Sequence, residues 1–324
     1  MKCGAATVRA QAGAALLMAM LTVALVASLA AGALWQQWRS VEVETAERAR
    51  VQSLWVLTGA LDWARLILRE DARSGGADHL AEPWAVPLAE ARLSTFLAAD
   101  KTSASDDDSA SQAFLSGLIT DLQSRLNVTN LIEADKVSEP SQRAFAKLFE
   151  RLGLPPGELT ALTENLRQAL NTNPDNPAPQ APLLPQRVDQ LVWLGLSPGT
   201  LAVLRPYITL LPVRTPVNLN TASATVLYAC IPSLDMALAQ RLVSARQNAH
   251  FRSLADAAAL IGQTTSPLNE TLHSVNTNFL EIQGRLRLDQ TVIEERSVVQ
   301  RDGLSVKTLW RERGNQGDQT APLQ

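Results

Sequence analysis

The chain has 324 residues, of which 46% are hydrophobic and 19% are charged. This composition supports a sizeable buried core and excludes disorder of the whole chain. The formal net charge of -3 gives no overall basic signature of nucleic-acid binding, while two cysteines and three histidines exclude a disulfide-stapled scaffold and leave little room for a histidine-rich metal site.

An uncharged stretch near the N-terminus predicts one membrane-spanning helix. No charged residue lies between Arg9 and Arg39. Residues 14–34 would span about 31 Å as a helix, close to the thickness of a bilayer core. Since the charges ahead of this stretch are positive, we expect the N-terminus in the cytoplasm and the long C-terminal part outside it. A cleaved secretory signal, cut near Ala30, is the alternative interpretation.

The helical pattern continues well beyond the apolar stretch. Apolar residues recur at helical spacing as far as Leu68, and Gly75 with Gly76 predicts the end of the helix at Ser74. One helix over residues 14–74 would leave the membrane as an apolar rod and continue as an amphipathic spine, which disfavours a cleaved signal. The leucines that we expect on its contact face, partly against the protein's own sheet and partly against neighbouring subunits, are Leu54, Leu57, Leu61 and Leu68.

The rest of the chain divides into a connector, a helical region and a strand block. The connector with the first strands covers residues 75–129, and apolar periodicity then predicts helices over 130–275. A proline-rich loop interrupts this helical region at 173–185. Alternating apolar residues predict three antiparallel strands over 276–313, and a flexible tail follows at 314–324.

An acidic triplet in the connector is a candidate for a bound cation. Asp106, Asp107 and Asp108 could coordinate a hard cation such as calcium through their carboxylate oxygens. The spacing of an EF-hand loop is absent, and a solvated turn or a helix cap is the alternative interpretation. The sequence requires no cofactor, and calcium is the one that the triplet would fit.

Ser197 stands in a segment that matches the nucleophile elbow of a hydrolase. Residues 195–199 read Gly-Leu-Ser-Pro-Gly, which is the G-x-S-x-G pattern. A proline directly after the serine instead favours a helix start capped by Ser197, and the related segment at 153–157 has proline at the serine position. No CxxC, HExxH, P-loop or dinucleotide fingerprint occurs. We therefore expect no enzyme, and a secreted hydrolase acting through Ser197 is the less favoured alternative.

Residues 217–262 resemble a helix-hairpin-helix of the nucleic-acid-binding kind. Such hairpins need glycines, because backbone N–H groups must approach phosphate closely. Here the hairpin at 232–235 reads Pro-Ser-Leu-Asp, and Asp235 would repel phosphate. A structural role is favoured, and a membrane-anchored nucleic-acid-binding protein of DNA uptake is the alternative. The polar residues that we expect to cap backbone are Asn218 and Asn220, and those that we expect to be solvated charges are Arg241 and Arg246.

The start of the chain resembles the precursors of type IV pilin-like proteins. A short positive leader ends at Gly13, and the apolar run starts at Ala14. The resemblance implies cleavage after Gly13 by prepilin peptidase, which also methylates the new amine of Ala14. Most such proteins carry glutamate at the fifth mature position, where this chain has Met18. Absence of that glutamate is typical of the general secretion pathway protein K family of type II secretion systems.

Two further segments are similar to the same family: residues 59–65, Gly-Ala-Leu-Asp-Trp-Ala-Arg, and residues 215–222, Thr-Pro-Val-Asn-Leu-Asn-Thr-Ala. The resemblance implies an α+β, pilin-like fold, with a long N-terminal transmembrane helix, an antiparallel sheet and a large inserted all-α domain. It implies a minor pseudopilin at the tip of the secretion pseudopilus, anchored in the bacterial inner membrane with most of the chain in the periplasm. Its implied role is structural, in the export of folded proteins across the outer membrane.

The resemblance also implies the partners. These are the other minor pseudopilins of the tip complex, prepilin peptidase and the inner-membrane secretion platform, with no nucleic acid among them. A glutamate buried in a bilayer needs a partner, which in the family is the free amine of the subunit ahead. A tip subunit has no subunit ahead, so Met18 fits that position.

Overall fold

The computed structural model describes residues 12–93, 113–171, 181–262, 268–288 and 291–314. The chain divides into two compact units, Met1–Val56 and Leu57–Gln324, and each is described by itself. The predicted calcium triplet, Asp106 to Asp108, lies outside the described residues.

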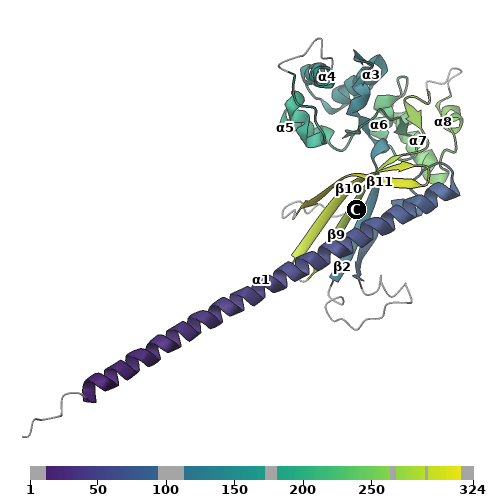
Figure 1. Cartoon of the computed structure of the whole chain (residues 1–324). Coiled ribbons are helices and arrows are strands. Elements are labelled where there is room, and N and C mark those ends of the chain that lie inside the picture. The colour runs from purple at the N-terminus through teal and green to yellow at the C-terminus, as the bar shows by residue number, and fades with distance from the viewer. Residues whose placement is uncertain (1–11, 94–112, 172–180, 263–267, 289–290, 315–324) are drawn as a thin grey trace, which may run out of the picture. The chain divides into compact units, whose positions relative to one another are not determined.

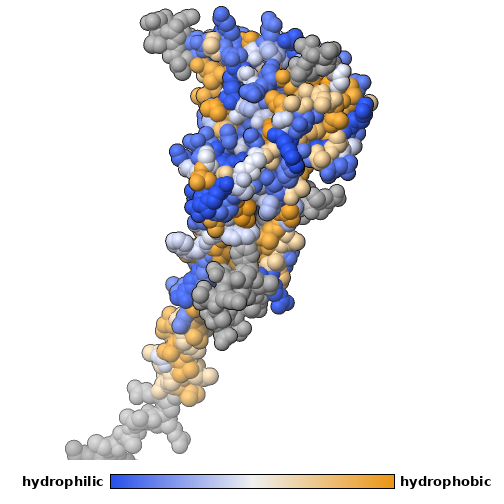
Figure 2. Space-filling model, turned by 90° about the vertical axis from the view of Figure 1, so that its right-hand side faces the viewer, coloured by the Kyte–Doolittle hydropathy of each residue, from blue (hydrophilic) through white to orange (hydrophobic). Residues whose placement is uncertain are grey.

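The first unit contains the N-terminal part of helix α1, which runs over Ala12–Ser74. Its large apolar side chains between Leu16 and Leu34 are more than half exposed, and Figure 2 shows them as an apolar surface at the described start of the helix. By length and composition this is a helix that could cross a membrane. A core helix of a soluble protein would bury these side chains instead.

The second unit is built on a five-stranded antiparallel sheet of order β1-β2-β9-β10-β11. Two strands precede the helical region in the chain and three follow it, so that region is inserted between the paired strands β2 and β9. This arrangement confirms the expected α+β, pilin-like fold. The strands are β1 Leu88–Arg92, β2 Ala113–Asp121, β9 Phe279–Leu288, β10 Thr291–Asp302 and β11 Ser305–Gly314.

The C-terminal part of α1 packs on one face of this sheet. Leu61, Ala64 and Leu68 share a buried cluster with sheet residues such as Ile282 and Val299. The close packing of the helix depends on Gly284 of β9, which pairs in register with Gly117 of β2. A Cβ at Gly284 would lie 3.3 Å from Leu57 Cδ2, so a larger residue there would push against the helix.

The helices of the insertion gather at one end of the sheet around a larger apolar core (Figure 1). Helix breaks fall where the sequence has glycine in the left-handed region, at Gly153 after α3 and at Gly195 after η5. The helices are α3 Glu139–Leu152, α4 Pro156–Leu170, η5 Val188–Leu194, α5 Pro198–Leu204, α6 Ala224–Cys230, α7 Met236–Asn248 and α8 Leu254–Ile261.

The start of the predicted helical region is wrong in detail. Residues 130–138 form the end of the short 3-10 helix η4 Val128–Leu131, followed by the hairpin of β4 Ile132–Glu133 and β5 Lys136–Val137. Ala134 and Asp135 make its turn with positive φ angles, which the apolar pattern does not reveal. The remaining short elements are η1 Pro83–Ala85, η3 Leu122–Ser124, β3 Leu126–Asn127, β6 Ile208–Thr209, β7 Val217–Asn218 and β8 His273–Ser274.

Candidate functional site

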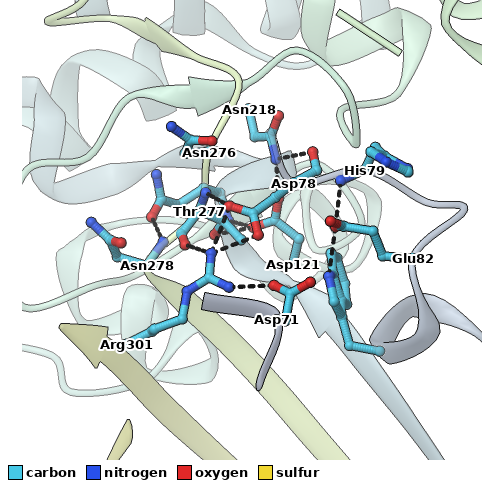
Figure 3. A network of polar contacts seen from close by, with 12 residues as sticks. Asp71, Asp78, His79, Glu82, Asp121, Asn218, Asn276, Thr277, Asn278 and Arg301 are labelled. Atoms are coloured by element: carbon cyan, nitrogen blue, oxygen red, sulfur yellow. Dashed lines mark hydrogen bonds and ion pairs between the residues drawn. The ribbon is translucent and has the colours of Figure 1, made fainter. Parts of the chain in front are cut away.

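A buried polar network, which we call the joint, connects the end of α1, the sheet and the helical region (Figure 3). It lies at the end of β2, where the chain leaves the sheet for the insertion, and at the start of β9, where it returns. Charged side chains are rarely buried unless they are paired, so each group here needs partners. The members of the joint are Asp71, Asp78, Glu82, Asp121, Asn218, Thr221, Thr277 and Arg301.

Arg301 of β10 carries the positive charge of the joint and is only 8% exposed. One guanidinium nitrogen donates to Asp71 of α1 at 2.6 Å, and another donates to Asp78 at 2.6 Å and to the carbonyl oxygen of Thr277 at 2.7 Å. Burial raises the pKa of Asp78, and the hydrogen bond and charge of Arg301 oppose that rise. The spine helix, the connector and the sheet are therefore held by one buried ion-pair triad.

Asp121 is the acceptor at the centre of the other half of the joint. One carboxylate oxygen accepts from the Gln123 backbone N–H at 2.7 Å and the Thr277 hydroxyl at 2.6 Å. The other accepts from the Thr221 hydroxyl at 2.6 Å and Asn218 Nδ2 at 3.0 Å. Burial raises the pKa of this carboxyl, and these hydrogen bonds to its charged form oppose the rise. Asp121 thus ties β2 to the helical region and to the segment before β9.

The acidic side chains of the joint do not form an open cation site. Carboxylate oxygens of Asp71, Asp78 and Glu82 lie within 4.8 Å of one another. However, Arg301 donates to the two aspartates, and Glu82 Oε2 accepts from the His79 backbone N–H and from Trp84 Nε1, each at 2.8 Å. These carboxylate oxygens already have donors within the protein, so this cluster is a network of ion pairs and hydrogen bonds.

Three of the four predicted spine leucines lie in the core of the second unit. Leu57, Leu61 and Leu68 are 2%, 7% and 0% exposed and lie on the sheet side of α1. They are therefore closed to a neighbouring subunit, which corrects the part of the expectation that gave them a shared face. Leu54 belongs to the first unit and is half-buried.

The other predicted site residues have clear positions. Gly13 and Ala14 lie in the first turn of α1, and Met18 is exposed on the apolar part of that helix. Ser197 caps α5, since its Oγ accepts from the Thr200 N–H at 3.2 Å. The prediction that Ser197 is a cap is confirmed, and the same hydroxyl also donates to Thr200 Oγ1 at 3.1 Å.

The degenerate hairpin between α6 and α7 turns its carbonyl groups towards the protein. Lys147 Nζ of α3 donates to the carbonyl oxygens of Ile231, Pro232 and Leu234 at 3.1 to 3.3 Å. Asp235 accepts from the Leu238 N–H and so caps α7. The backbone carbonyl groups of the hairpin thus bind a lysine of the same chain.

Two predictions on this segment have different outcomes. Asn220 binds both backbone groups of Phe251, and Asn218 accepts from the Asn220 N–H, so their capping role is confirmed. Arg241 is exposed, as expected. The prediction that Arg246 is a solvated charge is wrong, because this side chain is half-buried and donates to the Leu219 carbonyl. Burial lowers the pKa of Arg246 to about 10.

A spine helix packed on an antiparallel sheet, with the sheet interrupted by a helical insertion, defines this chain as a pilin-like protein. Family models described as type II secretion system (T2SS), protein K match residues 124–213 and 217–276. These matches support a minor pseudopilin of type II secretion that is similar to the protein K family.

Two individual comparisons support this assignment. The chain is 29% identical to the type II secretion system protein K of Pseudomonas aeruginosa PAO1, over 94% of this chain and 90% of the relative. Its fold is similar to that in a crystal structure of the GspK-GspI-GspJ complex from the enterotoxigenic Escherichia coli type 2 secretion system, with a TM-score of 0.58 and 18% identity. That match covers 83% of this chain and 98% of the other. Neither relative gives support to the DNA-uptake alternative.

Proposed function

We propose that this minor pseudopilin caps the tip of the pseudopilus and helps to start its assembly. The carrying observation is Met18, an apolar residue on the apolar part of α1 at the position where most pilin-like proteins have glutamate. A carboxylate there would need a partner ahead of it in the fibre, whereas methionine needs none. A subunit with no neighbour ahead is the one at the tip.

The inserted helical region supports the same position. It occupies one end of the sheet and is larger than the sheet that carries it. Subunits stacked along a fibre would have to accommodate this volume at every repeat, but a single subunit at the end would not. The tip position therefore removes a steric conflict as well as an electrostatic one.

We propose that the partners are two other minor pseudopilins, since the similar solved chain is part of a complex with GspI and GspJ. Full-length chain in detergent should co-purify with both in a fixed ratio. A gold label on the helical region should appear once, at a fibre end. Labels distributed along fibres would contradict the tip role, and a chain that binds neither partner would contradict the proposed complex.

We further propose that the chain is processed after Gly13 and anchored in the inner membrane by α1. Its N-terminus would be cytoplasmic and its second unit periplasmic, where the secretion platform assembles the fibre. Mass spectrometry should find a mature N-terminus at methylated Ala14. Gly13→Val should block cleavage because a branched side chain enlarges the cleavage position, and a mature N-terminus near Ala31 would contradict this processing.

We propose a structural role without catalysis and without nucleic-acid binding. The hairpin that would have to approach phosphate presents its carbonyl groups to Lys147 instead. A gel shift with duplex DNA should show no complex at physiological salt, because phosphate binding depends on positive potential and on close N–H groups. A salt-sensitive complex that is lost in Arg241→Ala would restore the DNA-uptake alternative.

A further inference from the structure

Each of the three histidines lies in the helical region or stacks against it. The ring contacts described below are made to backbone groups or to another histidine ring, and not to carboxylates. His79 lies in the connector after α1, His250 in the turn between α7 and α8, and His273 in β8. The position of the turn is fixed by Asn220, which binds both backbone groups of Phe251. Histidine is the side chain whose charge ordinarily changes between pH 5 and 8.

His79 and His250 form a stacked pair across the boundary between connector and helical region. Their ring centroids are 3.8 Å apart and the ring planes differ by 14°. The Ala81 N–H donates to His79 Nδ1 at 3.2 Å, so that nitrogen is an acceptor and the neutral ring carries its proton on Nε2. Protonation of His79 would place two N–H groups against each other. Two charged rings at this spacing would also repel.

His273 is held in the same neutral form inside the helical region. It is 1% exposed, its Nδ1 accepts from the Asn269 N–H at 3.3 Å, and its Nε2 lies 3.3 Å from the Cys230 carbonyl oxygen. A proton added at Nδ1 would oppose the Asn269 N–H. These two partners of the ring are backbone groups, so neither of them would compensate the charge as a carboxylate would.

We propose that the stacked His79 and His250 form an acid-sensitive latch that holds the helical region on the connector and opens on acidification, and that the buried His273 makes the helical region itself respond in the same direction. The charged groups near the stacked pair are Glu82 of the connector, with Asp71 of α1 beside it, and Arg252 with Asp256 on the turn side. The ionisable groups on the elements around His273 are the thiol of Cys230, which is neutral because burial raises its pKa to about 12, and the ammonium group of Lys147. Glu82 is already engaged by two N–H donors.

The direction of the pH dependence follows from the histidines. Burial, then the charges of His79 and Arg252, lower the pKa of His250, and burial lowers the pKa of His273. The folded chain therefore binds these protons more weakly than the unfolded chain, whose histidines titrate near 6.5. The stability that the latch contributes is present above that pH and is lost as the pH falls towards the lowered values.

The carboxylates of the joint cannot produce the same loss. Burial raises the pKa values of Asp71, Asp78 and Asp121. A raised carboxyl pKa means that the folded chain binds the proton more tightly, so acidification through that range adds stability. A loss of stability between pH 7.5 and 5.5 is thus a signature of the histidines.

Hydrogen exchange on the full-length chain in detergent tests the latch. Between pH 7.5 and 5.5, after correction for intrinsic exchange, wild type should exchange several-fold faster at residues 76–82 and 249–252, while β9 and β10 stay protected. His250→Phe keeps a flat ring that stacks but cannot titrate, so it should remove most of this acceleration. His79→Phe with His250→Phe should remove it all at these two segments.

Thermal melting over the same pH range gives the second measurement, and it does not depend on the tip role. The melting temperature of wild type should fall more on acidification than that of the double phenylalanine variant. Equal exchange in wild type at both pH values would overturn the proposal. The proposal would also be overturned by a second result. This is that His250→Phe and the double variant melt like wild type at pH 7.5 and still show the same acceleration of exchange at pH 5.5.

Discussion

The carboxylate of Asp121 shows how one residue can hold two parts of the chain together. It is buried and accepts four hydrogen bonds, from groups on η3, on β7 and the segment after it, and on the segment before β9. A carboxylate has room for about four such donors and cannot donate itself, so these four hydrogen bonds favour the ionised form and oppose the effect of burial. The residue is the last of β2 and pairs with Leu280 of β9, where the chain exits the sheet and where it re-enters.

Asp121→Asn should therefore destabilise the protein although it changes few atoms. The NH₂ group of the new side chain would face hydrogen-bond donors that the carboxylate oxygen had accepted from. A buried donor without an acceptor lowers the free energy of unfolding by about 1–3 kcal/mol. Chemical denaturation at pH 7 can be followed by tryptophan fluorescence, to which Trp84, buried beside the joint, contributes. The matched control is Asp62→Asn, whose exposed pair with Arg65 is worth less than about 1 kcal/mol. Equal effects of the two changes would contradict the role given to Asp121.

At the scale of elements, α3 and the α6–α7 hairpin form one unit through Lys147. The ammonium group binds three hairpin carbonyls, and it lies 4.2 Å from the centre of the Tyr228 ring. Burial lowers the pKa of Lys147, and the carbonyl and ring contacts offset that cost of burying its charge. In nucleic-acid-binding proteins such a hairpin binds phosphate through its N–H groups. Here its carbonyl groups bind Lys147 of α3.

Lys147→Met should separate these elements while it retains the apolar stem. Loss of the charged donor leaves three carbonyls with fewer partners, and we expect destabilisation by about 1–3 kcal/mol. Hydrogen exchange should become faster at residues 231–235 before it does in the sheet. Lys136→Met, on the exposed hairpin strand β5, is the control and should leave both measurements unchanged. Exchange at 231–235 that matches wild type would show that the hairpin does not depend on Lys147.

Local chemistry explains which elements the sequence predicts well. The cap at Ser197, the hydrogen bond from the Asn220 N–H to Asn218 and the three last strands depend on neighbours in the chain, and the pattern reveals them. The hydrogen bonds of Asn220 to Phe251 connect residues 31 positions apart, and the pattern does not reveal that partner. The joint has no such signal, because Asp121 and Arg301 come to share Thr277 as a partner only after the chain has returned from the insertion. The sequence places Arg246 in solvent for the same reason, since its acceptor at Leu219 lies on another element. The resemblance at 215–222 contains two joint residues but does not say what they bind.

At the scale of the molecule, one helix serves two environments. The first part of α1 exposes nearly all of its apolar side chains, whereas the part from Leu57 buries one face against the sheet. The insertion leaves the sheet intact because β2 and β9 pair in register from Ala113 with Leu288 to Asp121 with Leu280. A large region can therefore be added to a pilin-like sheet at one end without disturbing the spine that assembles.

Met18→Glu tests where in the fibre this spine belongs. In a tip subunit the introduced carboxylate would have no amine ahead of it, and a charge in the apolar span costs up to about 3 kcal/mol. We expect the full-length variant to start fewer pseudopili, with the number of fibres per cell as the measurement. Met18→Leu preserves volume and polarity and should behave as wild type. If the glutamate variant were instead found along the fibre shaft at normal or higher yield, the chain would have a subunit ahead of it and the tip role would be wrong.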